Sequence, residues 1–193
     1  MADHCIIILA AGESSRMGEP KQLLPYRGLS LIEHAFITAS NACEYVTVVL
    51  GANAEEILDR VPAITNVAVI NENWKNGMGS SISFGLNAVL SKLPELNSAV
   101  FMTADPPFIT ALHLKQLLGL HKSSAVSIAA SSYNDVAGIP ALFGSIHFPD
   151  LLKLNADKGA KELIRNNPQN VVKLPFAGAA FDVDTQDEYA ALE

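Results

Sequence analysis

Short apolar runs alternate along the chain with segments in which apolar residues recur at helical spacing. Apolar runs of this length predict strands, and the longer periodic segments predict helices. The predicted strands span residues 4–10, 45–50, 67–71, 99–103, 125–130, 140–143 and 171–174. The predicted helices span residues 31–43, 54–60, 80–92, 111–121, 148–154, 160–166 and 186–192. This alternation is typical of an α/β fold, with a mostly parallel sheet and helices on both of its faces.

Local signals refine this picture. Ser30 with Glu33, and Thr185 with Glu188, have the spacing of capping boxes and predict the starts of two helices. Residues 134–138 predict a turn, so the strands on either side are expected to pair antiparallel and make the sheet mixed. Because the chain has no internal repeat, linker or low-complexity tract, we expect a single domain over residues 1–193.

Composition and charge narrow the class of protein. Of 193 residues, 49% are hydrophobic and 17% are charged, which is ordinary for a compact enzyme with one sizeable core. The net charge of −7 leaves no basic stripe, so no nucleic acid partner is expected. No apolar run approaches the length of a membrane span and no leader pattern begins the chain, so we expect a cytoplasmic protein with no membrane partner. Cys5 and Cys43 lack paired spacing and are expected to be small hydrophobic residues in a reducing compartment.

A loop rich in glycine, hydroxyl and cationic residues directly follows the first predicted strand. Residues 9–21 read Leu-Ala-Ala-Gly-Glu-Ser-Ser-Arg-Met-Gly-Glu-Pro-Lys. A loop that leaves the carboxyl end of such a strand binds the ligand in open α/β sheets. Backbone N–H groups near Gly12 and Gly18 can approach phosphate oxygens, and Arg16 and Lys21 can neutralise their charge. The loop therefore indicates triphosphate binding, with a glycine turn and solvated charges as the alternative.

Two better-known phosphate motifs do not fit this loop. In a Walker A motif the lysine directly follows the second glycine and precedes Ser or Thr, whereas here Glu19 and Pro20 intervene and Gln22 follows the lysine. The dinucleotide fingerprint requires a glycine where Ser14 stands, and no acidic residue is placed to bind the ribose. A dinucleotide-dependent oxidoreductase is therefore not expected.

Acidic residues near two strand ends are candidates for metal binding. Asp105 follows a buried strand and precedes two prolines, which remove backbone donors and stiffen the turn. Opposite a triphosphate, one or two carboxylates together with phosphate and water oxygens satisfy Mg²⁺. Asp182 and Asp184 would share one face by strand alternation and form the second candidate pair. The alternatives are a turn at Asp105, with Thr110 capping the next helix, and capping of the last helix by Asp184 and Thr185.

Two later segments carry glycines beside a predicted helix start. Gly77 and Gly79 let the backbone approach a flat ligand, and Ser80 and Ser81 are expected to cap the following helix. This pattern suggests recognition of a base or ribose, with a surface loop before a capped helix as the alternative. Residues 138–144 predict a glycine-flanked strand, and residues 155–161 a helix start with two lysines and a glycine. Together they could hold a second anionic substrate.

Taken together, these motifs resemble the MobA-like NTP transferase family, and within it the molybdenum cofactor cytidylyltransferases. The family consists of nucleotidyltransferases with a Rossmann-like, glycosyltransferase-A-like fold that nucleotide-diphospho-sugar transferases share. The matching pieces cover nearly the whole chain and comprise residues 9–21, 77–81, 103–105, 138–143, 157–160 and 182–185. Two positions depart from the usual motifs, because Pro106 replaces a glutamine and Ala156 replaces a glycine.

The resemblance implies a reaction and a role for each matching position. The implied nucleotide-binding residues are Leu9, Ala10, Ala11, Gly12, Ser14, Ser15, Gly18, Gly79, Ser80 and Ser81. Arg16 would contact the leaving pyrophosphate and Lys21 the α-phosphate, while Asp105 would bind Mg²⁺, with Asp182 or Asp184 as a further ligand. The substrates would be CTP and molybdopterin, and a molybdoenzyme would be the client of the product. The alternatives are GTP or another NTP, a sugar or polyol phosphate acceptor, and a non-catalytic accessory protein for a molybdoenzyme.

Overall fold

Seven strands form one mixed sheet in the order β5-β4-β1-β6-β8-β7-β9. The computed structural model describes residues 3–14, 18–105, 107–123, 126–133, 135–155, 159–176 and 188–189. The strands are β1 His4–Ala10, β4 Val46–Leu50, β5 Ala68–Ile70, β6 Ser98–Thr103, β7 Ile128–Tyr133, β8 Val136–Gly144 and β9 Val171–Pro175. β8 pairs antiparallel with β6 and β7, and the other neighbours pair parallel. The predicted mixed, mostly parallel sheet is confirmed.

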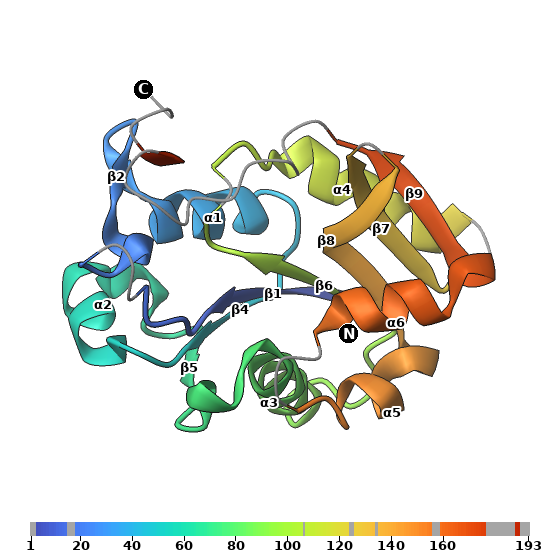
Figure 1. The fold of residues 1–193 in the computed structure, drawn as a ribbon, viewed down its shortest axis with the longest axis horizontal. Coiled ribbons are helices and arrows are strands. Elements are labelled where there is room, and N and C mark those ends of the chain that lie inside the picture. Colours follow the sequence, from blue (N-terminus) through green and yellow to red (C-terminus); the bar gives the residue numbers. More distant parts are fainter. Residues whose placement is uncertain are drawn as a thin grey trace.

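Helices cover both faces of this sheet (Figure 1). On one face lie α1 Leu31–Ser40, α2 Ala54–Arg60 and α4 Ala111–Ser123, and on the other lie α3 Met78–Leu90, α5 Phe148–Leu151 and α6 Ala160–Asn166. The alternation of strand side chains divides the apolar core in the same way. In β1, Ile6 and Ile8 pack with the first group of helices, and Cys5 and Ile7 pack with the second. The predicted Rossmann-like α/β fold is confirmed.

The structure shifts several element boundaries. The helix predicted at 80–92 begins at Met78 and ends at Leu90, and the one predicted at 148–154 ends at Leu151. A two-stranded hairpin was missed because strands of two residues are too short to show alternation. Short elements outside the main sheet and the α-helices are β2 Pro25–Tyr26, β3 Leu29–Ser30, η1 Lys21–Leu23, η2 Pro62–Ile64, η3 Trp74–Asn76, η4 Ser145–His147 and η5 Pro168–Asn170.

Other local predictions can be compared directly with the structure. The Ser30 capping box is confirmed, because the backbone N–H of Glu33 donates to Ser30 Oγ and the Glu33 carboxylate accepts from the Ser30 N–H. The second box and most of the helix predicted at 186–192 lie outside the described residues. Neither Cys5 nor Cys43 forms a disulfide in the described part of the chain. None of the described helices has the length and apolar character needed to cross a membrane.

Candidate functional site

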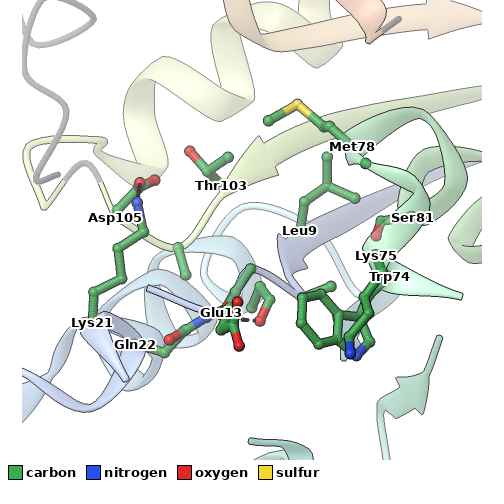
Figure 2. A pocket seen from close by; sticks show the side chains of 15 residues that line it. Leu9, Glu13, Lys21, Gln22, Trp74, Lys75, Met78, Ser81, Thr103 and Asp105 are labelled. Carbon is green, nitrogen blue, oxygen red and sulfur yellow. Dashed lines mark hydrogen bonds and ion pairs between the residues drawn. The ribbon is translucent and has the colours of Figure 1, made fainter. Parts of the chain in front are cut away.

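A cavity of about 340 Å³ lies where β1 and β6 end, which is the size of a small-molecule pocket. Its walls come from the end of β1 and the loop after it, from η1, from η3 and the start of α3, and from the end of β6 (Figure 2). The described residues that line it are Leu9, Ala10, Ala11, Gly12, Glu13, Lys21, Gln22, Trp74, Lys75, Gly77, Met78, Ser81, Thr103, Ala104 and Asp105. The cavity therefore occupies the position that open α/β sheets use for ligands.

An ion pair joins the loop after β1 to the end of β6. Lys21 Nζ donates to Asp105 Oδ2 at 2.5 Å, and the two side chains are only 20% and 9% exposed. The other carboxylate oxygen, Asp105 Oδ1, is buried and has no hydrogen-bond partner among the described residues. Lys21 and Asp105, which the sequence predicts for phosphate and metal, are thus brought together, and one carboxylate oxygen has no hydrogen-bond partner among the described residues.

Gln22 holds the loop after β1 in shape. Its side chain is buried, and Nε2 donates to the carbonyls of Ala10 and Gly12, both at 2.9 Å. On the same turn, Ser14 Oγ donates to Gln22 Oε1 at 3.3 Å and accepts from the Lys21 N–H at 3.1 Å. Ser14 adopts a φ of 57°, a left-handed conformation that is uncommon outside glycine. This positioning role of Gln22 was not predicted from the sequence, because the two carbonyls that it contacts are brought to it only by the fold.

The segment before α3 is tied together by Asn71, a second residue that the sequence analysis missed. Asn71 is buried, and its Nδ2 donates to the hydroxyls of Ser80 and Ser81, each at 3.1 Å. Ser80 Oγ in turn donates to the carbonyls of Asn73 and Gly77. The expectation that Ser80 and Ser81 cap the helix is wrong, because α3 begins two residues earlier and Gly77 precedes it without a side-chain cap. The hydroxyls instead hold the loop that precedes the helix.

The predicted site residues fall into three groups. The structure brings seven of them to the cavity, namely Leu9, Ala10, Ala11, Gly12, Lys21, Ser81 and Asp105. Gly79 and Ser80 lie in the first turn of α3 and Ser14 and Gly18 in the loop, and none of these four is among the described lining residues. Ser15, Arg16, Asp182 and Asp184 lie outside the described residues.

The described lining contains no histidine. Burial lowers the pKa of His34, His113 and His147, but these three side chains lie elsewhere in the fold. Among the described residues, no group of three or more His, Cys, Asp or Glu side chains is placed to hold a metal ion. A single carboxylate such as Asp105 suits a hard cation that takes its other ligands from phosphates and water.

The fold and this cavity place the chain among the α/β proteins that have a ligand site at the carboxyl ends of parallel strands, and comparison with known proteins identifies its family. The family model for the MobA-like NTP transferase domain, which describes the sequences of that family, matches residues 6–171 of this chain. The chain therefore belongs to the MobA-like NTP transferase family and is a nucleotidyltransferase.

Full-length relatives carry different names. Nicotine blue oxidoreductase of Paenarthrobacter nicotinovorans is 32% identical over 94% of this chain and 92% of that protein. The purine catabolism protein PucB of Bacillus subtilis (strain 168) is 29% identical over 95% of this chain and 92% of that protein. Molybdenum cofactor cytidylyltransferase of Escherichia coli (strain K12) is 23% identical, again over 95% of this chain and 92% of that protein. The crystal structure of Rv0371c from Mycobacterium tuberculosis H37Rv superposes with a TM-score of 0.84 at 29% identity, covering 99% of this chain and 97% of that one. A manganese complex of Rv0371c superposes with a TM-score of 0.77 at 27% identity, covering 98% of this chain and 97% of that one.

Proposed function

We propose that this nucleotidyltransferase moves CMP from CTP to the terminal phosphate of molybdopterin and releases pyrophosphate. Similarity over 95% of the chain to the E. coli molybdenum cofactor cytidylyltransferase supports this choice of substrates. The observation that carries the proposal is the pairing of Lys21 with Asp105 at one end of the cavity. A cation for the α-phosphate and a carboxylate for a metal ion thereby stand together at the carboxyl ends of two adjacent parallel strands.

The proposed reaction is an in-line displacement at phosphorus. An oxygen of the molybdopterin phosphate forms a bond to the α-phosphorus of CTP, while the bond from that phosphorus to the bridging oxygen breaks. Pyrophosphate leaves with the bridging oxygen and the electron pair of the broken bond. A phosphate nucleophile is already ionised at neutral pH and needs no general base, in keeping with a described lining that contains no histidine. Positioning and charge neutralisation therefore supply the catalysis.

Each site residue has a defined task in this mechanism. Backbone N–H groups of the loop after β1 hold the triphosphate, and Arg16 contacts the leaving pyrophosphate. Lys21 exchanges its bond to Asp105 for one to the α-phosphate, where its charge stabilises the transition state. Asp105 fits a divalent cation such as Mg²⁺, because its buried Oδ1 is an oxygen ligand without another partner among the described residues. When bound, the cation neutralises charge on the phosphates. Asp182 and Asp184 are the candidates for a further ligand.

Divalent-metal dependence has independent support from a relative. A manganese complex of Rv0371c has been solved. We expect a chelator to abolish turnover and added Mg²⁺ to restore it, since the triphosphate and the single carboxylate together complete the ligand set of a hard cation. Turnover that persists in excess chelator would contradict this role of Asp105.

Pyrophosphate release measured with molybdopterin and each of the four NTPs tests the proposed reaction. CTP should support release, and Lys21→Ala or Asp105→Ala should each lower the rate by about 10²- to 10³-fold, as for loss of one transition-state donor. Lys153→Ala is the matched control, because Lys153 is 77% exposed and pairs with Asp150 on the surface at 3.6 Å. Release with GTP and not CTP would overturn the nucleotide assignment. CTP binding without release would favour a carrier of cofactor to a molybdoenzyme.

A second candidate function follows from the name of one relative. Because a protein 32% identical to this chain is named nicotine blue oxidoreductase, a redox activity is the competing class. The loop after β1 has Ser14 where the dinucleotide fingerprint has a glycine, which disfavours a nicotinamide cofactor. Consumption of NADH or NADPH with nicotine blue as acceptor, together with no pyrophosphate release from any NTP, would replace the transferase proposal by this one.

A further inference from the structure

The cavity has two chemically different ends (Figure 2). Lys21 and Asp105 form a charged end beside the finish of β6. Trp74 and Met78, from η3 and the start of α3, lie at the other end. A ligand with a polyanionic part and a flat, weakly polar part would match both ends at once. A nucleoside triphosphate has these two parts. Its phosphates match the charged end of the cavity, and its base is the part that would match the end formed by Trp74 and Met78.

Backbone contacts hold Trp74 in place before any ligand binds. Its N–H donates to the carbonyl of Asn71 at 3.2 Å, and its own carbonyl accepts from the N–H of Gly77 at 3.0 Å. A Cβ added to Gly51 would lie 2.6 Å from Trp74 Cβ and 2.8 Å from Cγ, so a glycine is required for this approach. The ring is half-buried and packs against the core cluster that contains α3. The aromatic surface is therefore preorganised, which reduces the entropy lost on binding.

The Trp74 side chain lines the cavity and is not fully buried. Lys75 Nζ lies over the ring, 5.4 Å from its centroid, and the Lys75 side chain is exposed. A long, solvated side chain that rests on the ring by a cation–π contact can move aside at a cost of about 1 kcal/mol or less. A planar group of higher contact area can take its place.

We propose that the indole of Trp74 is the surface on which the nucleobase stacks. The inference rests on the proposed function, because it takes a nucleoside triphosphate whose phosphates lie at the Lys21 end of the cavity. Stacking on an aromatic ring tolerates any base, since every base has a π-face. Trp74 therefore contributes affinity for all NTPs that enter the cavity and does not by itself select CTP.

The chain contains a single tryptophan, so intrinsic tryptophan fluorescence reports on this position alone. With Mg²⁺ present, CTP should quench the emission, because a stacked base contacts the excited ring. Inorganic tripolyphosphate, which has the phosphates but no base, should compete with CTP for binding and leave the emission unchanged. CTP binding seen by equilibrium dialysis without any change of emission in the wild-type protein would overturn the stacking proposal.

Substitutions separate stacking from packing. By equilibrium dialysis, Trp74→Leu should weaken CTP binding by about 10-fold or more, while Trp74→Phe, which retains an aromatic face, should stay within about 3-fold of wild type. Tyr45→Leu removes an exposed aromatic ring outside the cavity and is the matched control. Wild-type affinity in Trp74→Leu would refute stacking while leaving the proposed reaction intact. If no NTP binds to the wild-type protein, both proposals fail.

Discussion

Replacing Gln22 by leucine removes the two hydrogen bonds that its amide donates to the loop after β1 and the one that it accepts from Ser14. The Gln22 amide is buried and donates to the carbonyls of Ala10 and Gly12, so it joins the last residue of β1 to the glycine of the loop. Leucine has a similar volume and is compatible with an apolar site, but it cannot donate. The variant therefore tests whether the amide positions the loop or merely fills space.

The expected size of the effect follows from the two donated bonds, which at 2.9 Å are shorter than the 3.3 Å bond from Ser14. Each neutral hydrogen bond contributes about 0.5–1.5 kcal/mol net, so the loop conformation should lose about 1–3 kcal/mol. If CTP binding must then restore the conformation, the Kd for CTP should rise by about 5- to 150-fold, since 1.4 kcal/mol corresponds to a factor of ten. For a chain of this size, the same loss should lower Tm by roughly 2–12 °C.

Calorimetric titration with CTP and thermal unfolding measure both quantities on the same protein. Gln116→Leu, the same substitution at an exposed position on α4, should leave Kd and Tm unchanged. Gln22→Glu keeps the shape but places a carboxylate oxygen against two carbonyls, so its defect should exceed that of leucine. A Gln22→Leu protein that binds CTP as tightly as wild type would refute the positioning role.

Three further predictions concern stability. Saturating CTP with Mg²⁺, at about 100 times Kd, should raise Tm by roughly 5–10 °C, and an unchanged Tm would argue against binding to the folded state. Burial lowers the pKa of His113 below its ordinary value of 6.5 in the folded protein. As the pH falls, the unfolded chain therefore takes up the His113 proton at a higher pH than the folded protein does. The free energy of unfolding should consequently fall as the pH drops through 6.5. His113→Gln should flatten that fall in urea titrations at several pH values, and an unaltered slope would contradict it. Gly85→Ala should destabilise by about 1–3 kcal/mol, because the added Cβ lies 2.6 Å from Val49 Cγ2, whereas Gly119→Ala, whose Cβ meets nothing within 4 Å, should be neutral or stabilising in urea unfolding.

Much of the fold was predictable because the deciding interactions are local. All seven strands of the sheet appear where apolar runs predict them, with shifts of a few residues at most in their bounds except at β7 and β8. The turn predicted at 134–138 correctly indicated the antiparallel pair that makes the sheet mixed, although β8 already begins at Val136. The errors fall where tertiary contacts override local preference, as at the start of α3, where Asn71 takes the hydroxyls that the sequence assigned to a cap.

The candidate site was predicted in part, for a related reason. Lys21 and Asp105 could be proposed separately, because each follows a recognisable strand and has a charge suited to one part of a metal–triphosphate complex. The contacts of Gln22 and Trp74 were not predicted, because they depend on partners that no local pattern reveals. The Gln22 amide can hold the loop after β1 only because the fold brings the carbonyls of Ala10 and Gly12 within hydrogen-bond distance of it.

The sequence by itself determined the type of each main element, the three-layer α/β class and the loop that follows the first strand. These properties depend on side-chain periodicity and on backbone preferences within a few residues. Only the tertiary structure decided the strand order, and with it the ion pair between Lys21 and Asp105, which are 84 residues apart. The same is true of Trp74 against Gly51 at the wall of the cavity. Such contacts depend on which strands become neighbours, and that choice minimises the free energy of the whole packed core and not of any one segment.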